Sequence, residues 1–266
     1  MRDLAGKVAV VTGGASGIGL AMARRFAAEQ MRVVLADIEK PALDRATEDL
    51  ASAGAEVVGI VTDVAEHASV VGLHDAVLDR FGAVHVVCNN AGVVGGSVAK
   101  SPIEFWEWVV GVNLFGVVNG CNVFLPTLMA QDEGHVVNTA SMAGLQGVGV
   151  LGIYCTTKFA VVGLSESLAQ ELAGSGSRVG VSVVCPGFVQ TKIAHSARNM
   201  PDRVRSVHED DDGKALSPLV DSGIPPEQVA DAVLDAVTEG RLYVITHPDM
   251  LRAAWDQRAA LLFGEH

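Results

Sequence analysis

Short, continuously apolar runs alternate along the chain with longer amphipathic runs. The apolar runs are rich in valine, which is typical of strands that are buried on both faces of a sheet. We predict strands at Lys7–Val11, Arg32–Ala36, Glu56–Val61, Val84–Cys88, His135–Thr139, Val179–Cys185 and Leu242–Ile245. Helical patterns lie at about 17–29, 41–53, 66–81, 102–130, 152–173, 226–239 and 248–262. This alternation predicts an α/β fold with a doubly wound parallel sheet of about seven strands and helices on both faces.

One segment departs from this rhythm. Residues 188–225 contain no clear strand; they include Pro201, Pro218 and Pro225, and Pro226 follows directly. A long irregular segment inside a compact domain is usually functional or mobile. Because no linker or repeat is visible, we predict one domain over residues 1–266, with a substrate lid at about 188–225.

Composition narrows the possible partners. The formal net charge is −12 and no basic face is visible, so nucleic acid and anionic membranes are disfavoured. We find no apolar run of about 18 residues and no signal segment, which predicts a cytoplasmic protein without a membrane span. The histidines show no metal-ligand spacing and the four cysteines form no C-x-x-C pair, so we predict no metal site.

A glycine-rich turn follows the first predicted strand. Gly13 permits a sharp exit from the strand, Gly17 lets the backbone approach a pyrophosphate, and Gly19 allows the next helix to pack closely. That helix would offer free N–H groups to phosphates at its N-terminus, where Ser16 and Ile18 flank Gly17. A purely structural turn is the alternative, but its place between a strand and a helix favours dinucleotide binding.

An acidic residue closes the second predicted strand. Asp37 lies about 20 residues beyond the glycines, where a carboxylate can accept both hydroxyls of an adenosine ribose. A 2′-phosphate would be repelled there, so we predict NAD rather than NADP as the cofactor. Asp63 and Val64 close the third strand and would contact the adenine ring. For both aspartates a helix cap is the structural alternative.

Three residues carry the candidate chemistry. Tyr154 and Lys158 are four apart near the start of a helical pattern, which places them on one helix face. Ser141 follows the strand His135–Thr139, and ligands bind beyond the carboxyl ends of such strands.

Together these motifs resemble the short-chain dehydrogenase/reductase family in its single-domain, Rossmann-type form. The resemblance is carried by Thr12–Gly19, Asp63, Asn89-Asn90-Ala91-Gly92, Asn113, Ser141, Tyr154-x-x-x-Lys158 and Pro186-Gly187, in the family's order and spacing. It implies an NAD-dependent enzyme that moves a hydride between the cofactor and an alcohol or ketone. It also implies a homodimer or homotetramer with its interface on the helices at 102–130 and 152–173.

The resemblance assigns roles residue by residue. Tyr154 would be the general acid/base, and Lys158 would stabilise its phenolate and bind the nicotinamide ribose. Ser141 would donate a hydrogen bond to the substrate oxygen. Asn113 would hold a water that links the lysine to solvent. The remaining family positions would border or bind the cofactor: Asn90, Ala91, Gly92, Pro186, Gly187, Val189 and Thr191.

The substrate is less constrained. Expected pocket residues are mostly apolar: Val94, Gly95, Met142, Ala143, Leu145, Val148, Leu151, Phe188, Ile193 and Met200. We therefore predict an uncharged, moderately hydrophobic secondary alcohol or ketone. A catalytically silent dinucleotide sensor or scaffold on the same fold is the alternative function.

Overall fold

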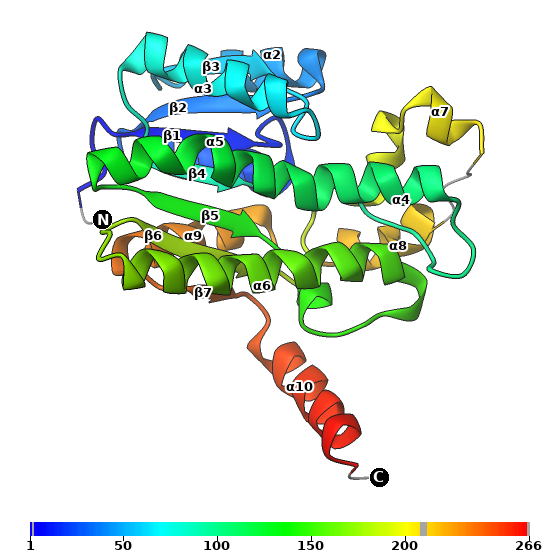
Figure 1. Cartoon of the computed structure of the whole chain (residues 1–266). Helices are drawn as coiled ribbons and strands as arrows, with labels where there is room; N and C mark the ends of the chain where they lie inside the picture. The colour runs from blue at the N-terminus through cyan, green and yellow to red at the C-terminus, as the bar shows by residue number, and fades with distance from the viewer. Residues whose placement is uncertain (2, 208–211, 265–266) are drawn as a thin grey trace.

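A seven-stranded parallel sheet forms the centre of the protein (Figure 1). The structure is a computed structural model, and it describes residues 1, 3–207 and 212–264. The strand order is β3-β2-β1-β4-β5-β6-β7. The strands are β1 (Val8–Thr12), β2 (Arg32–Asp37), β3 (Val57–Val61), β4 (Val86–Asn89), β5 (His135–Thr139), β6 (Gly180–Cys185) and β7 (Tyr243–Ile245). This confirms the predicted fold class.

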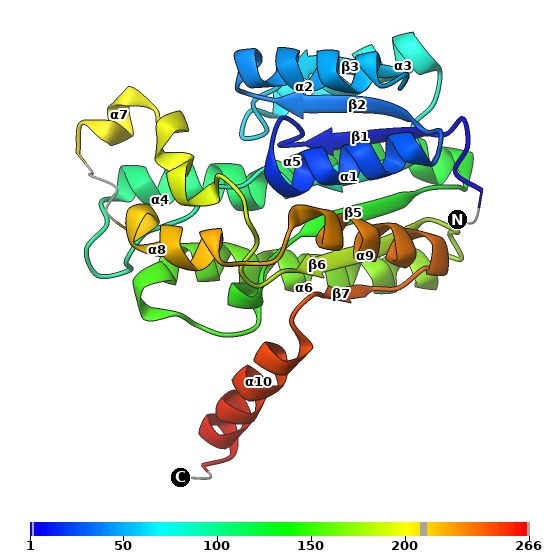
Figure 2. The ribbon, with the colours of Figure 1, turned by 180° about the vertical axis from the view of Figure 1, so that it is seen from behind.

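Helices cover both faces of the sheet, as Figures 1 and 2 show from opposite sides. One face carries α1 (Gly17–Ala28), α2 (Lys40–Ser52) and α9 (Pro226–Glu239), and the other carries α3 (His67–Phe81), α5 (Gly116–Gln131) and α6 (Gly152–Gly174). Each face buries its own apolar cluster against alternate residues of the same strands. The central strands β1 and β5 are buried along their whole length, which explains their continuous apolar sequence.

The sheet reverses its strand order between β1 and β4. Strands β2 and β3 lie on one side of β1, and β5, β6 and β7 lie beyond β4. In open parallel sheets a crevice forms at such a reversal, beyond the carboxyl ends of the strands. The fold therefore fixes where a ligand would bind before any side chain is considered.

The helix predicted at 102–130 is interrupted. It begins as α4 (Ile103–Val110), passes through a π-helical turn at Gly111–Phe115, and continues as α5. The whole helix Ile103–Gln131 is long and apolar enough to cross a membrane, but half of its most apolar window is buried in the protein. Since α5 packs on β4 and α3, and the π turn packs on α6, we interpret it as a core helix.

The segment predicted as an irregular lid is largely helical. It contains a 3₁₀ stretch at Ile193–Asn199, α7 (Asp202–Arg205) and α8 (Asp212–Asp221), and Val189 forms a bridge with Ile224. Helix α7 begins directly after Pro201, and prolines at such positions broke the sequence pattern into pieces too short to recognise. Helix α7 contacts α4, and α8 packs on the 3₁₀ stretch; both helices lie beyond the carboxyl ends of the strands (Figure 2).

The chain ends in α10 (Pro248–Phe263), which extends away from the sheet (Figure 1). Beyond its middle it is attached to the protein, because Arg258 donates a hydrogen bond to the carbonyl of Leu145 and stacks over Phe159. Its last residues Leu261, Leu262 and Phe263 are exposed.

Candidate active site

A cavity of about 680 Å³ lies at the carboxyl ends of the strands, where the strand order reverses. Nearly every predicted site residue lines it: Gly13, Ser16, Gly17, Ile18, Asp37, Asp63, Val64, Asn90, Ala91, Gly92, Ser141, Tyr154, Lys158, Pro186, Gly187, Val189 and Thr191. Gly19 and Asn113 do not line it, and both lie directly behind its wall. The sequence motifs, which span 180 residues of chain, thus converge on one cavity.

The glycine-rich turn packs too tightly for side chains. Gly13 and Gly17 have φ values of +63° and +53°, a region that favours glycine. A Cβ at Gly17 would lie 3.0 Å from Thr191 Cγ2, and one at Gly13 would lie 2.9 Å from Ala91 Cα. Ser16 precedes α1 but its side chain makes no capping hydrogen bond, so the first N–H groups of α1 remain available to an anion in the cavity.

Asp37 stands at the end of β2 on the cavity wall. Its Oδ2 accepts the N–H of Ala15 at 3.0 Å and its Oδ1 accepts the N–H of Glu39 at 3.0 Å. Burial raises the pKa of Asp37, and these two N–H groups oppose that shift. The N-cap position of α2 is Glu39, so Asp37 is not the helix cap that was the structural alternative.

Asp63 and Val64 lie on the neighbouring part of the wall. Asp63 Oδ1 accepts the N–H of Ala65 at 3.0 Å, and the Val64 carbonyl accepts a hydrogen bond from Asn119 Nδ2 at 2.9 Å. Asp63 therefore stabilises the turn before α3 and also lines the cavity. Both predicted contacts with adenine remain open in this geometry.

A threonine that the sequence analysis quoted only as part of a motif holds the turns together. The Thr12 hydroxyl accepts the N–H groups of Asn90 and Ala91 at 2.9 and 3.1 Å. Asn90 Nδ2 donates to the Thr12 carbonyl, and Asn90 Oδ1 accepts from the Thr139 hydroxyl. Asn90 thereby connects the ends of β1, β4 and β5. The signal in the sequence was a hydroxyl residue at the last position of the first strand.

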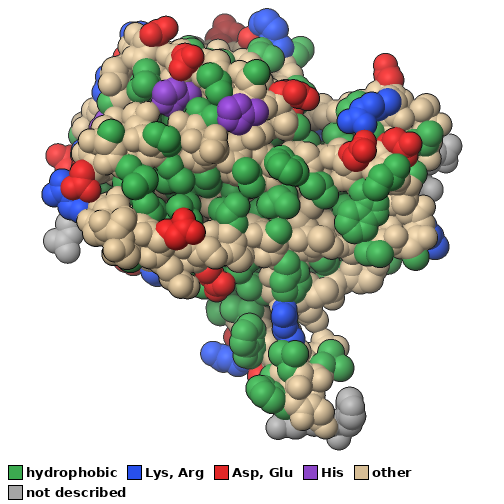
Figure 3. Space-filling model, viewed as in Figure 1, with side chains coloured by type: hydrophobic (Ala, Val, Ile, Leu, Met, Phe, Trp, Pro, Cys, Tyr) green, Lys and Arg blue, Asp and Glu red, His purple; other side chains and the backbone are tan. Residues whose placement is uncertain are grey.

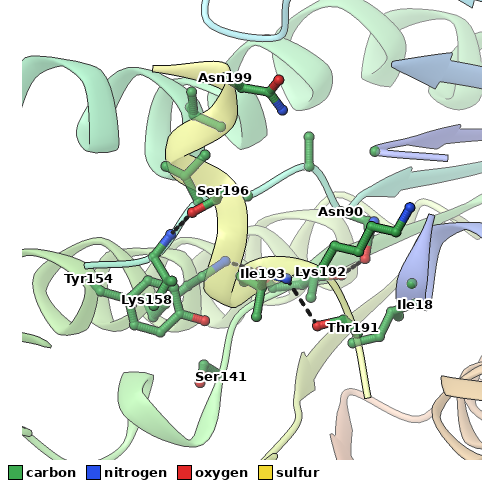
Figure 4. A pocket seen from close by; sticks show the side chains of 18 of the residues that line it. Ile18, Asn90, Ser141, Tyr154, Lys158, Thr191, Lys192, Ile193, Ser196 and Asn199 are labelled. Atoms are coloured by element: carbon green, nitrogen blue, oxygen red, sulfur yellow. Dashed lines mark hydrogen bonds between the residues drawn. The ribbon is translucent and has the colours of Figure 1, made fainter. Parts of the chain in front are cut away.

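Tyr154, Lys158 and Ser141 meet at the other end of the cavity, as Figure 4 shows. Lys158 Nζ lies 5.5 Å from the centre of the Tyr154 ring and donates to the Thr139 carbonyl at 2.8 Å. Ser141 Oγ accepts the N–H of Ala143 at 3.1 Å, so the Ser141 side chain is oriented by the short 3₁₀ turn Met142–Gly144. Tyr154 and Lys158 come from the first turns of α6, and Ser141 follows β5.

Burial acts in opposite directions on the two titratable groups. It raises the pKa of Tyr154 to about 12, and the contact with Ser141 opposes this shift. It lowers the pKa of Lys158 to about 8. The protein alone therefore favours a neutral phenol beside a weakened ammonium, and a phenolate at this site needs further positive charge.

Asn113 lies in the π-helical turn and is fully buried. Its Oδ1 accepts the N–H of Val93 at 2.8 Å, and its Nδ2 donates to the Val93 carbonyl at 2.9 Å and to Thr157 Oγ1 at 3.2 Å. Asn113 thus connects the segment after β4 to α6, next to Lys158. The predicted water relay through this residue stays a prediction.

The strand β6 leads directly into the segment predicted to hold the nicotinamide. The Pro186 carbonyl accepts the N–H of Met142, and the Gly187 N–H donates to His247 Nδ1 at 3.1 Å. His247 precedes α10 and was missed in the sequence analysis, because its partner lies 60 residues away. The Thr191 side chain packs directly against Gly17, so this segment closes over the glycine turn.

The part of the cavity near Tyr154 is largely apolar. Val94, Met142, Ala143, Val148, Leu151, Phe188 and Ile193 line it as predicted, whereas Gly95, Leu145 and Met200 do not. The structure adds Trp108, Val112, Val150, Leu216, Leu219, Val220 and Met250. Trp108 packs edge-to-face on Phe105 and also reaches the cavity.

The cavity fits an elongated ligand with phosphates at its middle. Glycines without room for side chains and free helix N–H groups would contact a pyrophosphate, an acid lies at one end of the cavity, and a phenol with a lysine lies at the other. Among residues 1, 3–207 and 212–264, no group of three or more His, Cys, Asp or Glu is placed to hold a metal ion. The residues present thus fit a nicotinamide dinucleotide.

Comparisons with known proteins agree with this geometry. The family model for short chain dehydrogenases matches residues 7–202. A crystal structure of a short-chain dehydrogenase/reductase from Burkholderia phymatum in complex with NAD is 41% identical, has a TM-score of 0.95, and covers 100% of this chain and 98% of its own.

Two further relatives show the range of the family. The meso-2,3-butanediol dehydrogenase of Serratia marcescens is 40% identical over 71% of this chain and 74% of its own length. An actinorhodin polyketide ketoreductase solved with NADPH is 32% identical, with a TM-score of 0.79, over 92% of this chain and 97% of its own. The chain belongs to the short-chain dehydrogenase/reductase family, and it is an oxidoreductase built on that fold.

Proposed function

We propose that this protein is an NAD-dependent enzyme that interconverts a secondary alcohol and the corresponding ketone. The observation that carries the proposal is the convergence of Ser141, Tyr154 and Lys158 at one end of a cavity whose other end holds Asp37. A silent sensor or scaffold would not require a buried phenol beside a buried lysine, since both are costly to bury. The complete triad therefore favours an enzyme over that alternative.

The chain's own residues would move the proton. When bound, an oxidised nicotinamide supplies the hydride acceptor and a positive charge beside the phenol. Tyr154 takes the hydroxyl proton of the alcohol during oxidation and returns it to the oxygen during reduction. Lys158 stabilises the phenolate, and Ser141 donates a hydrogen bond to the substrate oxygen as negative charge develops there.

The choice of NAD over NADP rests on charge at the adenosine end. Asp37 would accept the ribose hydroxyls and would repel a 2′-phosphate. Glu39, two residues later, lines the same end and adds a second negative charge. The related structure that holds NAD supports this choice. The related ketoreductase was solved with NADPH, so the affinities for the two cofactors are compared directly in the test below.

The substrate proposal follows from the lining of the cavity. Its walls near Tyr154 carry Trp108, Met142 and Leu151, while the nearby Arg203 is paired with Glu107 at 3.1 Å. A carboxylate substrate would thus lack an unpaired guanidinium at that rim. We propose an uncharged, moderately hydrophobic substrate that is covered by the segment 188–225.

The same reasoning extends to assembly. Figure 3 shows hydrophobic side chains gathered over the face formed by α5 and α6. Phe115, in the π turn before α5, and Met129, on α5, are exposed. Such a face is typical of an interface between subunits. We propose a homodimer or homotetramer that uses this face, in the cytoplasm.

The proposed function is tested with wild-type protein and a panel of secondary alcohols, each with NAD or NADP. We expect NADH absorbance to appear with apolar alcohols and kcat/KM to be at least about tenfold higher with NAD than with NADP. Preference for hydroxy acids would overturn the substrate proposal. Tight NAD binding with no turnover on any alcohol or ketone would instead favour the silent sensor.

The pH dependence should differ between the two directions. Because the pKa of Tyr154 is raised by burial, the phenol dominates at neutral pH and the phenolate fraction grows as pH rises. We expect kcat/KM for oxidation to increase from pH 6 to pH 8, while kcat/KM for reduction does not. The pKa of Lys158 is lowered to about 8, so its positive charge is lost above that pH and the rise in oxidation should flatten. A fall in oxidation between pH 6 and pH 8 would contradict the assigned base.

A further inference from the structure

Two segments that are 159 residues apart meet at the adenosine end of the cavity. Glu39 follows β2, and Arg198 and Asn199 end the 3₁₀ stretch Ile193–Asn199. Glu39 Oε1 accepts hydrogen bonds from Arg198 Nε at 2.9 Å, from Arg198 Nη2 at 2.6 Å and from Asn199 Nδ2 at 2.9 Å. All three residues line the cavity, so this contact borders the place where the adenosine ribose would lie.

The rest of the Arg198 guanidinium is also engaged. Its Nη1 donates to the carbonyls of Lys192 and His195 at 3.1 and 2.9 Å. Arg198 Nη1 therefore stabilises the fold of the stretch 192–199, while Nε and Nη2 bind Glu39. The two side chains remain about one third exposed, at 35% and 28%, so the pair can open toward a ligand.

Asp37 and Arg198 also act on each other electrostatically. Burial raises the pKa of Asp37; the negative charge of the Glu39 carboxylate adds to this shift, although the Glu39 N–H opposes it, and the positive charge of Arg198 opposes it as well. A guanidinium so close to the ribose-binding acid can reach a phosphate on the ribose 2′-oxygen. Guanidinium groups bind phosphate in a bidentate manner, which makes Arg198 chemically suited to NADP as long as nothing else holds it.

We propose that Glu39 determines cofactor specificity by holding Arg198, which would otherwise bind the 2′-phosphate of NADP. This inference rests on the proposed use of NAD. Asp37 excludes the 2′-phosphate by its own charge, and Glu39 excludes it by occupying the nearest guanidinium. Removing only the acid at position 37 leaves Arg198 paired and gives a poor NADP enzyme.

The other cations on the cavity wall fit this role less well. Among the described residues that line the cavity they are Lys158, Lys192 and Arg203. Lys158 lies at the nicotinamide end and Arg203 is paired with Glu107. Lys192 belongs to the same stretch as Arg198 and lies near Glu39, so it is the competitor that the experiment must separate.

The test measures dissociation constants of NAD and NADP by calorimetry for full-length proteins. The series is wild type, Asp37→Ser, Asp37→Ser with Glu39→Gln, and that double variant with either Arg198→Gln or Lys192→Gln. We expect Asp37→Ser with Glu39→Gln to bind NADP at least about tenfold more tightly than Asp37→Ser alone. Adding Arg198→Gln should remove this gain, and adding Lys192→Gln should leave most of it.

A second readout separates a charge contact from a change of shape. NADP affinity of the double variant should fall more steeply with rising salt than that of Asp37→Ser, because a new ion pair is screened. Equal NADP affinity with and without Arg198 overturns the inference, as does a gain that depends on Lys192. Failure of wild type to bind NAD overturns the proposed function instead, and it is visible before any variant is made.

Discussion

Replacing Tyr154 with phenylalanine should lower kcat in both directions by about 10³-fold, within the range found for loss of a general acid/base. The substitution removes only the hydroxyl, and the ring keeps its position 5.5 Å from Lys158 Nζ. The dissociation constant of NAD should therefore stay within about threefold of the wild-type value. Steady-state rates from NADH absorbance and calorimetric titration with NAD provide the two numbers.

Tyr243 offers a matched control for this substitution. Its hydroxyl donates to Glu166, about three turns along α6 from Tyr154, and Tyr243 does not line the cavity. Tyr243→Phe removes the same atom and should leave kcat within about twofold, with a modest loss of stability from the broken hydrogen bond. Near-normal rates for Tyr154→Phe would refute the proposed proton transfer, whatever the control does.

The size of the expected effect depends on how the phenol is held. Burial raises the pKa of Tyr154 and lowers that of Lys158, so the protein alone opposes the charged pair. In the proposed mechanism the phenolate would then form when positive charge from an oxidised nicotinamide is close. Proton removal would thereby be linked to cofactor binding, and the buried phenol would stay neutral at other times.

The sequence predicted those parts of the site that depend on local chemistry. A strand followed by closely spaced glycines, an acid at a strand end, and Tyr154 four residues before Lys158 each express a constraint within one or two elements. Because the carboxyl ends of parallel strands meet at one edge, such local signals combine into one site once the strand order is known. The fold class, the family and much of the cavity lining followed from them, but the structure adds lining residues such as Trp108 and Leu216 that no local signal indicated.

Contacts between distant segments could not be predicted in this way. The Glu39–Arg198 pair joins residues 159 positions apart, and neither residue stands in a pattern that names the other. The π-helical turn around Asn113 differs from an α-helix by hydrogen-bond register rather than by composition. Helix α7 escaped notice because its four residues are too few to show a periodicity, and α8 because Pro218 interrupts its pattern.

Gly19 shows how a local signal carries a non-local constraint, and its substitution gives the second large effect. A Cβ at Gly19 would lie 2.2 Å from the Gly13 carbonyl oxygen and 2.7 Å from Asn90 Nδ2. Gly13 has little room to move away from such a methyl group, because its own backbone packs so closely on Ala91 that even a Cβ would not fit there. Alanine at position 19 must therefore push α1 away from the turn and misplace the N–H groups that would hold the pyrophosphate.

We expect Gly19→Ala to weaken NAD binding by at least about tenfold, or about 1.4 kcal/mol, and to lower the free energy of unfolding by about 1–3 kcal/mol. Gly72→Ala is the matched control, since Gly72 lies in α3 and a Cβ there meets nothing within 4 Å. That control should keep NAD affinity and gain about 0.5–1 kcal/mol of stability from helix propensity. Calorimetric titration and urea unfolding of both variants separate a damaged turn from a damaged fold. A methyl group at position 19 fits only if the backbone of the turn moves. Wild-type NAD affinity in Gly19→Ala would therefore mean that this turn does not hold the pyrophosphate.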